Sequence, residues 1–232
     1  MIAVRPARER LRTRIGWLDS WHTFTFEEHI DPRHMGYRAL RVLNEDRVAP
    51  GRGYGSHPRR DLELVSYVVG GALRHHDSLG TDALVEAGGI QRLSAGTGVL
   101  HGEANASASE PLHVLHMWIA PARARLRPSY GHKAYPLRLR RGPLTLLASA
   151  DGRDGSLKVH QDVAMLSIVL KPRDRASYWL ADERHAWVQV VNGSVELNGV
   201  ALTAGDGAAV SDEVELELTS ASVSETLLFD LA

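Results

Sequence analysis

The sequence contains no cysteine among its 232 residues. Disulfides and thiolate metal sites are therefore excluded, and thiol-based redox sensing is excluded with them. No apolar run approaches the roughly 18 residues that a membrane-spanning helix needs. The arginine-rich segment 5–14 has no apolar stretch after it, so it lacks the pattern of a secretory signal. We therefore expect a cytoplasmic protein without a membrane partner.

An excess of charge of one sign is also missing, because 27 basic and 28 acidic residues give a formal net charge of -1. No global field draws such a chain to nucleic acid, so we expect no direct nucleic-acid partner. Hydrophobic residues make up 44% of the chain and charged residues 24%, the balance of globular domains with a real core. A protein partner and a small aromatic or anionic ligand both remain open.

The hydrophobic periodicity of the sequence predicts no long amphipathic helix, and only residues 9–17 could supply one short helical turn. Most periodic segments are short, rich in Val, Ile and Leu, and separated by Gly or Asn-Gly turns. Many short strands joined by tight turns predict an all-β sandwich or barrel. Representative strands are expected at 62–69, 111–119, 144–147, 186–191 and 214–218.

A weak internal repeat divides the chain. Residues 67–73 and 189–195 each form an apolar segment that runs into a glycine turn, and each is followed by a second turn containing Ala-Gly. One duplicated barrel explains this pattern better than one large sheet. We predict two tandem jelly-roll-like β-barrels, with the limits 1–120 for the first domain, 121–142 for the crossing segment and 143–232 for the second domain.

One segment carries the spacing of a metal site. Residues 51–70 follow the first signature of the cupin barrels, Gly-x5-His-x-His-x3-Glu-x6-Gly, at every anchor except the second histidine, which is Arg59. Residues i and i+2 of a strand share a face. We therefore expect His57, Arg59 and Glu63 to point into one barrel mouth.

A second, looser cupin signature follows at residues 87–103, where a glycine turn precedes His101 and Glu103. These two side chains are also separated by two positions and are expected to face the same mouth. Imidazole and carboxylate ligands with an open position suit Fe(II), and also Zn, Ni or Cu. The first barrel is thus the candidate metal-binding domain.

Short motifs spread along the chain extend this pattern, namely Ser-Trp-His-Thr-Phe at 20–24, Asp-Pro and Met-Gly within 31–36, Gly-Ser-His-Pro at 55–58, His-Asp-Ser-Leu-Gly at 76–80, Ser-Ala-Gly-Thr-Gly at 94–98 and Asp-Gly-Ser at 154–156. With them the whole chain resembles the pirins, a bicupin family that includes bacterial proteins with quercetin 2,3-dioxygenase activity. The resemblance implies a mononuclear metal, usually iron, held in the N-terminal cupin by three histidines and one glutamate. His57, His101 and Glu103 match three of these positions.

Arg59 occupies the fourth ligand position. Arginine stays protonated and offers no lone pair to a metal. A guanidinium about 4 Å from a divalent cation would be repelled by roughly 8 kcal/mol at an effective dielectric near 20. We therefore do not expect a conventional four-ligand iron site.

Three arrangements remain open. Arg59 turns aside to pair with Glu63 or Asp61, and the three remaining ligands hold a metal completed by water. Alternatively, the pocket is metal-free, and Arg59 pairs with Glu103 or binds an anionic ligand. In the third arrangement, His116 on the following strand supplies the missing ligand; otherwise it lines the barrel and binds nothing.

Two other places are not expected to bind a metal. His75 and His76 precede Asp77 at a strand end and are more typical of a structural motif of the family than of a second metal site. In the second barrel, the offset from the shared glycine turn puts Trp179 and Ala181 at the positions of the first two ligands. The C-terminal domain is therefore predicted to be a degenerate cupin.

Two functions are compatible with these residues. The resemblance implies a metal-dependent dioxygenase that cleaves flavonol-like, phenolic or enolic molecules with oxygen, with Glu103 as both ligand and base. The alternative is a non-enzymatic regulatory or ligand-binding protein that acts through a protein partner. In either case Arg59, Glu63 and His116 are the residues expected to contact a ligand.

Overall fold

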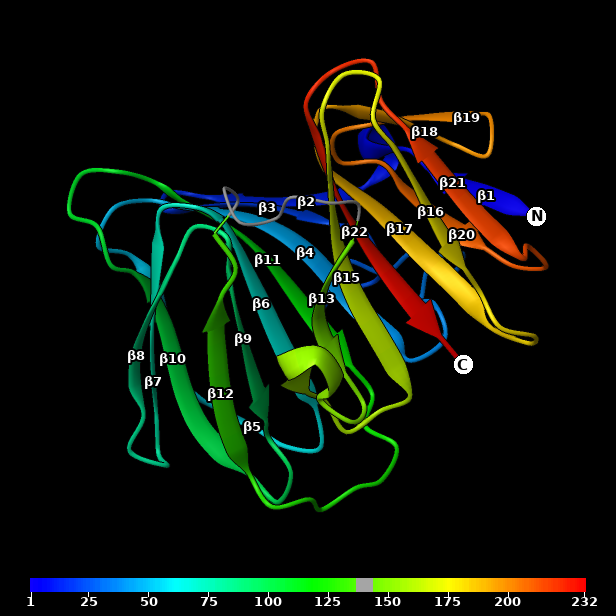
Figure 1. The fold of residues 1–232 in the computed structure, drawn as a ribbon. Helices are drawn as coiled ribbons and strands as arrows, with labels where there is room; N and C mark the ends of the chain where they lie inside the picture. The colour runs from blue at the N-terminus through cyan, green and yellow to red at the C-terminus, as the bar shows by residue number, and fades with distance from the viewer. Residues whose placement is uncertain (137–143) are drawn as a thin grey trace. The chain divides into compact units, whose positions relative to one another are not determined.

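The computed structural model describes residues 1–136 and 144–232. Within them the chain forms 22 strands, two short 3-10 turns, and no α-helix (Figure 1). The first 3-10 turn, Ala7–Glu9, overlaps the start of the segment where one helical turn was expected. No helix in the described part of the chain is long and apolar enough to cross a membrane. The all-β prediction is confirmed.

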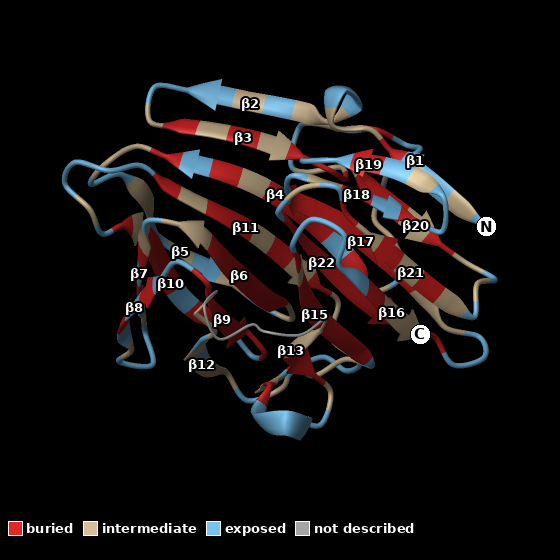
Figure 2. Cartoon of the chain, turned by 45° about the horizontal axis from the view of Figure 1, so that its top comes forward, coloured by how far each residue is buried: buried red, intermediate tan, exposed pale blue. Residues whose placement is uncertain are grey.

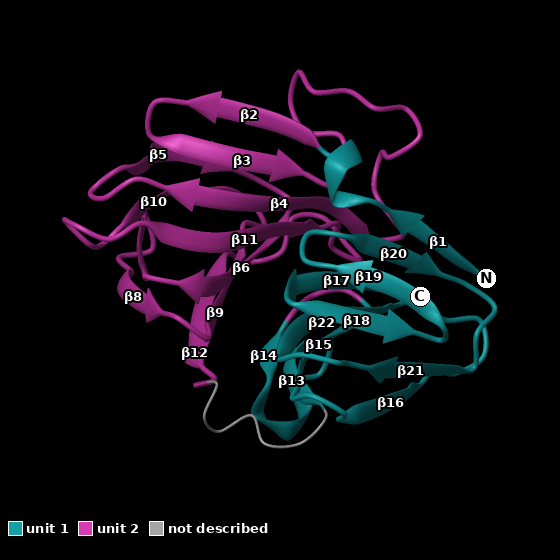
Figure 3. Ribbon diagram, turned by 90° about the horizontal axis from the view of Figure 1, so that it is seen from above, with its two compact units in different colours: residues 1–10, 137–158, 162–232 teal, residues 11–136, 159–161 magenta. Residues whose placement is uncertain are grey.

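The chain folds into two compact units (Figure 3). The N-terminal unit contains residues 11–136 and 159–161, and the C-terminal unit contains residues 1–10, 137–158 and 162–232. The first ten residues, which the sequence assigned to the first barrel, belong to the C-terminal unit because β1 (Ile2–Arg5) pairs with β20 (Gly207–Val210).

The predicted crossing segment 121–142 also differs in the structure. Its residues 137–142 lie outside the described residues. Within its described part, β12 (Ser129–Ala134) pairs with β9 (Gly89–Ser94), because residues 129–134 supply backbone groups to the open edge of that strand. This part of the crossing is therefore a sheet strand of the N-terminal unit.

The N-terminal unit is built from two antiparallel sheets, one of seven strands and one of four. The seven-stranded sheet has the order β12-β9-β6-β11-β4-β3-β2, and the four-stranded sheet has the order β5-β10-β7-β8. Strand β2 lies at a sheet edge and is largely exposed (Figure 2). The remaining strands are β2 (Leu11–Ile15), β3 (Leu18–His22), β4 (Leu40–Val48), β5 (Gly53–Arg59), β6 (Glu63–Gly70), β7 (Ala72–Asp77), β8 (Asp82–Glu86), β10 (Val99–Asn105) and β11 (Leu112–Ile119).

Apolar side chains fill this unit on both sides of a polar middle layer. Along β6, Leu64 and Val68 belong to two separate hydrophobic clusters, and Ser66 lies between them on the same strand face. Along β11, Val114 packs in one of these clusters and Trp118 packs against the other, with His116 between them. The alternation of strand residues thus places polar groups in the middle of the barrel interior.

The C-terminal unit repeats the same two-sheet plan. Its seven-stranded sheet has the order β1-β20-β17-β22-β15-β13-β14, and its four-stranded sheet has the order β16-β21-β18-β19. This duplication confirms the prediction of two tandem cupin barrels. The strands are β13 (Thr145–Ser149), β14 (Leu157–Lys158), β15 (Val163–Leu170), β16 (Arg175–Trp179), β17 (His185–Asn192), β18 (Ser194–Leu197), β19 (Val200–Thr203), β21 (Glu215–Thr219) and β22 (Ser224–Leu231).

The interior of the C-terminal unit is apolar where the other unit is polar. The β16–β21 ladder corresponds to the β5–β10 ladder, and in it Ala176 lies opposite Leu218 and Tyr178 opposite Leu216. All four side chains belong to or pack against one hydrophobic cluster. Trp179, at the expected ligand position, is 66% exposed. The described residues of this unit therefore supply no group of metal ligands.

Candidate metal centre

The candidate site is built on three neighbouring strands of the four-stranded sheet, β5, β10 and β7. On β10, His101 lies opposite His57 of β5, and the two rings are 4.5 Å apart between centroids. On the other side of β10, Glu103 lies opposite His75 of β7, and His101 lies opposite Asp77. Antiparallel pairing thus sets histidines on both flanks of the His101–Glu103 pair.

Of these side chains, His57, His101 and Glu103 face a cavity of about 640 Å³ inside the N-terminal unit. His57, Arg59, His101, Glu103 and His116 all line it. Four of the five polar positions that the two cupin signatures single out, all except Glu63, therefore open onto one space. Aromatic side chains also line the cavity, namely Trp17, Phe26, Tyr54 and Trp118.

A row of polar residues crosses the facing seven-stranded sheet. Register pairs Gln91 with Ser66, Ser66 with His116, His116 with Asn44, and Asn44 with His22. His22 Nδ1 and Asn44 Oδ1 are 2.9 Å apart, so the row is joined by hydrogen bonds as well as by register. This row meets the histidines and the glutamate of the other sheet across the cavity.

Glu103 is the centre of the network between the two sheets. Gln91 Nε2 donates a hydrogen bond of 2.5 Å to Glu103 Oε1, and His116 Nε2 lies 2.9 Å from Glu103 Oε2. Burial alone would raise the pKa of Glu103, but the hydrogen bond and the charge of His116 outweigh burial and hold that pKa well below its ordinary value. Glu103 is therefore an ionised carboxylate at neutral pH.

His116 lies between two carboxylates. Its Nδ1 is 2.7 Å from Asp46 Oδ2, and its Nε2 contacts Glu103. Burial opposes the charged form, but the two carboxylates together raise the pKa of His116 to about 10. An imidazolium has no lone pair for a metal. The structure thus places His116 in the cavity as a charged partner of Glu103, in contrast to the arrangement in which it is the missing metal ligand.

His101 and His75 carry buried ring nitrogens without hydrogen-bond partners among the described residues. Both nitrogens of His101 are in this state, and burial lowers the pKa of His101 to about 4, so its ring is neutral at pH 7. His75 Nδ1 is also without a partner, whereas its Nε2 bonds Asp77. Burial lowers the pKa of His75, but Glu103 and Asp77 outweigh burial and raise it, so a metal at His75 Nδ1 would displace a proton. Imidazole nitrogens without a partner beside an ionised carboxylate are groups that a divalent metal accepts, so these residues fit such an ion.

Arg59 turns toward an aromatic ring. Its guanidinium carbon lies 4.4 Å from the centroid of the Trp118 ring, a cation–π geometry. The side chain is half buried, and its Nε has no hydrogen-bond partner in the described part of the chain. The expected partners are engaged elsewhere, since Asp61 contacts Arg60 and Glu63 contacts Ser94.

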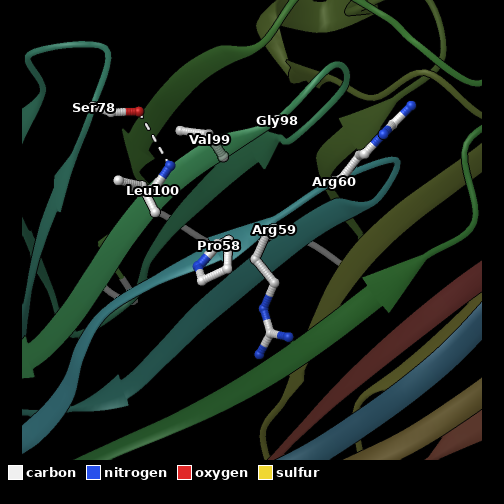
Figure 4. Close-up of a pocket in the computed structure, with 7 residues that line it drawn as sticks. All are labelled: Pro58, Arg59, Arg60, Ser78, Gly98, Val99 and Leu100. Carbon is white, nitrogen blue, oxygen red and sulfur yellow. Dashed lines mark hydrogen bonds between the residues drawn. The ribbon is translucent and has the colours of Figure 1, made fainter.

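The end of β5 also borders a second cavity of about 420 Å³ (Figure 4). There Arg59, the last residue of β5, and Arg60, just after it, extend in different directions. Ser78 Oγ accepts a hydrogen bond from the Leu100 backbone on this side. Histidines and carboxylates do not line this second cavity among the described residues, so it is not a metal site.

The prediction that Glu63 faces the barrel mouth is wrong in its geometry. Strand β5 ends at Arg59, and Asp61 adopts a positive φ of 50°, so the chain turns before β6 begins at Glu63 in the other sheet. Glu63 is buried outside the main cavity, where it accepts hydrogen bonds from Ser94 Oγ at 2.9 Å and His160 N at 3.2 Å. The argument from alternation fails because it assumed one continuous strand.

Sequence reasoning missed the facing polar row and gave His75 only a structural role. The row had one local signal, since Ser66 interrupts the otherwise apolar run 64–69 of β6. A lone polar residue in a buried strand requires a hydrogen-bond partner, so this interruption predicts a polar contact. His75 lacked such a signal because its neighbour Glu103 is set by pairing between distant segments.

The fold and the site together define a tandem cupin protein with a candidate metal centre in its first barrel. The Pirin family model matches residues 4–119, and the model of the quercetinase C-terminal cupin domain matches residues 146–231. The chain belongs to the pirin family.

Relatives resemble the chain over its whole length. It is 43% identical to the quercetin 2,3-dioxygenase of Escherichia coli strain K12, over 100% of this chain and 99% of the relative. It is 40% identical to a putative quercetin 2,3-dioxygenase of Pseudomonas aeruginosa, over 100% of both chains.

Solved structures agree with this assignment. The crystal structure of YhhW from Escherichia coli matches with a TM-score of 0.96 at 43% identity, covering 100% of this chain and 98% of that one. The nickel(II) complex of the bacterial pirin YhhW matches with a TM-score of 0.95 at 44% identity, covering 100% and 99%. The nickel complex of this relative and the histidine–glutamate cluster of the present chain together suggest a divalent metal.

Proposed function

We propose that this pirin is a metal-dependent dioxygenase that acts on flavonol-like or other phenolic and enolic small molecules. The observation that carries the proposal is a cavity of about 640 Å³ with aromatic walls, lined by His101 and Glu103 of the buried histidine–carboxylate cluster. Small-molecule sites in proteins have volumes of this order, roughly 300–1,000 Å³. The relatives named quercetin 2,3-dioxygenase support the same reaction class.

The chain's own residues would bind and orient such a substrate. Phe26 and Trp118 pack edge to face at 5.3 Å and offer apolar ring surface to an aromatic ligand. A metal bound at the cluster would supply a Lewis acid for the substrate's adjacent hydroxyl and carbonyl oxygens. Glu103 would accept a hydrogen bond from a hydroxyl group of the substrate, because its carboxylate is held ionised by His116.

The low pKa of Glu103 refines its role. A carboxylate that binds a proton weakly is a poor base toward a phenol or an enol. We therefore assign Glu103 to metal binding and to orienting the substrate hydroxyl, and only secondarily to proton removal. His116 and Asp46 hold this carboxylate in place through contacts of 2.9 and 2.7 Å.

Arg59 would favour substrates that carry negative charge. Its guanidinium lines the cavity, and no carboxylate forms an ion pair with it among the described residues. A guanidinium binds carboxylates and phenolates through charge-assisted hydrogen bonds. The proposed substrates are therefore ionised phenols, enolates or aromatic carboxylates rather than strictly neutral flavonols.

Oxygen uptake tests this proposal. The protein is reconstituted with Fe(II) or Ni(II), and oxygen consumption is measured with quercetin and with hydroxylated aromatic carboxylates of similar size. We expect uptake that depends on substrate and stops when a chelator is added. Metal-loaded protein that consumes no oxygen with any of these compounds would rule the proposal out.

A second function is favoured by one observation, the arginine at a family ligand position. A protein that binds the aromatic or anionic ligand without turnover, and signals its presence to a protein partner, would need no conventional metal site. Calorimetry distinguishes the two functions: this alternative predicts binding of quercetin or an aromatic carboxylate by metal-free protein, with affinity unchanged by added metal.

A further inference from the structure

Three buried donors on β10 and β7 form a compact group. One ligand atom from each of His75, His101 and Glu103 lies within 4.8 Å of the others. These side chains belong to residues that are 0%, 3% and 6% exposed. His57 is not a member of this group, although it lies beside His101 on the other flank.

The hydrogen bonds of His75 show why this group points to a cation. Asp77 is held by the backbone N–H groups of Leu79 at 2.8 Å and Thr81 at 3.1 Å, and its Oδ2 lies 3.0 Å from His75 Nε2. An imidazole that donates one N–H to a carboxylate presents a lone pair on its other nitrogen, the usual arrangement of a metal-ligating histidine. His75 therefore has the orientation of a ligand.

The lone pair of His75 meets another acceptor. His75 Nδ1 lies 3.7 Å from Glu103 Oε1 and has no hydrogen-bond partner in the described part of the chain. Two acceptors that face each other in a buried site require a positive species between them, either a proton or a metal. The ring of Tyr130 stacks on His75 with centroids 4.4 Å apart and holds the imidazole plane in place.

Strand order explains why the ligand set would differ from the one that the cupin signatures predict. The order β5-β10-β7 places Arg59 on one flank of β10 and His75 on the other. Neighbouring strands lie about 4.8 Å apart. A metal bound between β10 and β7 is therefore farther from Arg59 than a metal bound between β5 and β10 would be. The repulsion between the Arg59 guanidinium and the metal cation falls with that distance.

We propose that this chain holds its divalent metal with His75, His101 and Glu103, so that the ligand set moves by one strand from β5 to β7. Two imidazoles and one carboxylate suit Fe(II), Ni(II) or Zn(II) and leave positions for water or substrate. His101 and Glu103 line the main cavity, so a metal bound to them has a path to it. The inference rests on the metal dependence proposed above and names the residues that carry it.

Metal content of matched variants tests the proposal. Each protein is dialysed against Ni(II), and bound nickel per chain is measured by mass spectrometry with folding checked by thermal unfolding. His75→Gln is expected to lose at least tenfold in nickel affinity. The control is His76→Gln, since His76 is exposed on the opposite face of the same strand, and it should bind nickel as the wild type does.

The Arg59→His background distinguishes a ligand from a structural residue. Arg59→His restores a lone-pair donor on β5, so the double variant Arg59→His/His75→Gln should bind nickel within threefold of Arg59→His alone. Loss of nickel upon His75→Gln in both backgrounds would assign His75 to folding and overturn the proposal. Unchanged binding in the wild-type background would also overturn it.

Anomalous diffraction from wild-type crystals soaked in Ni(II) avoids any variant that fails to fold. We expect a nickel peak about 2.1 Å from His75 Nδ1, the usual metal–imidazole distance. A peak between His57 and His101, or no peak, would overturn the proposal. If such crystals show nickel at His57 while the protein consumes oxygen with quercetin, the proposed function stands and only the ligand assignment fails.

Discussion

At the scale of single residues, the site is defined by which nitrogens keep a lone pair. His116 is flanked by Asp46 and Glu103 and is charged, whereas His101 is neutral because burial lowers its pKa. Two histidines a few ångströms from the same carboxylate thus have opposite roles. The difference arises because both ring nitrogens of His116 lie within 2.9 Å of a carboxylate oxygen, whereas the Glu103 oxygen lies 4.0 Å from His101 Nδ1.

Replacing Glu103 tests the centre of the network. Glu103→Gln removes the carboxylate and leaves the buried imidazolium of His116 with Asp46 as its remaining charged partner. Nickel affinity should fall by at least tenfold, and the unfolding free energy of the metal-free protein should fall by about 2 kcal/mol because a charged hydrogen bond is lost. Nickel titration and urea unfolding measure the two effects. An unchanged nickel affinity would show that Glu103 is not a ligand.

Arg59 affords a prediction about substrate charge. Arg59→Gln keeps a polar side chain beside Trp118 but removes the charge. The dissociation constant for an aromatic carboxylate should rise about tenfold, the order expected for losing one charge-assisted hydrogen bond. The dissociation constant for a neutral compound of the same shape should change by less than threefold. Calorimetry with both ligands checks this, and equal effects on the two would contradict it.

At the scale of the strand, the site depends on how closely β5 approaches β10. Gly53 of β5 lies opposite Ala104, and a Cβ at Gly53 would come within 2.2 Å of the Glu103 carbonyl oxygen. The two nearest atoms belong to the backbone and cannot move aside without separating the strands. Glycine at this position is therefore required by a close approach.

Gly53→Ala should lower the unfolding free energy by about 1–3 kcal/mol, because a methyl group is forced against backbone. Gly55→Ala is the matched control on the same strand, since a Cβ at Gly55 meets nothing within 4 Å. The control should change stability by no more than about 0.5 kcal/mol. Urea unfolding of both variants decides the point, and equal losses would mean that β5 is not held this closely to β10.

The strands also show what the sequence could and could not predict. Alternation and glycine turns were sufficient for the all-β fold, and the spacing of His101 and Glu103 placed both on one face of β10. The turn at Asp61 was not predicted because local residues that favour a positive φ were not recognised within the cupin signature. The neighbourhood of His75 depends on pairing between β7 and β10, which no short-range pattern specifies.

At the scale of the whole molecule, two barrels of the same plan differ in what fills them. The N-terminal unit has a polar middle layer, and the C-terminal unit has a continuous apolar core. The repeat predicted this duplication. It could not predict that β1 pairs with β20, because the two segments are about two hundred residues apart in the chain.

Because only the N-terminal unit has the polar layer with the candidate metal ligands, a destabilising substitution in the apolar core of the C-terminal unit should leave metal binding unchanged. Leu216 is fully buried there, and Leu216→Ala should lower the unfolding free energy by about 2–5 kcal/mol through a lost side chain and a new cavity. Nickel bound per folded chain should remain that of the wild type. Thermal unfolding and nickel analysis measure the two quantities. A loss of nickel from folded protein would contradict a metal site confined to the N-terminal unit.

The central claim is that the first barrel binds a divalent metal despite an arginine at a family ligand position. Equilibrium dialysis against Ni(II), with wild type and Arg59→His side by side, tests it most directly. We predict one nickel per chain in both proteins, with at least tenfold tighter binding in Arg59→His. Wild-type protein that binds no nickel at millimolar concentration, or two proteins with equal affinity, would contradict the account.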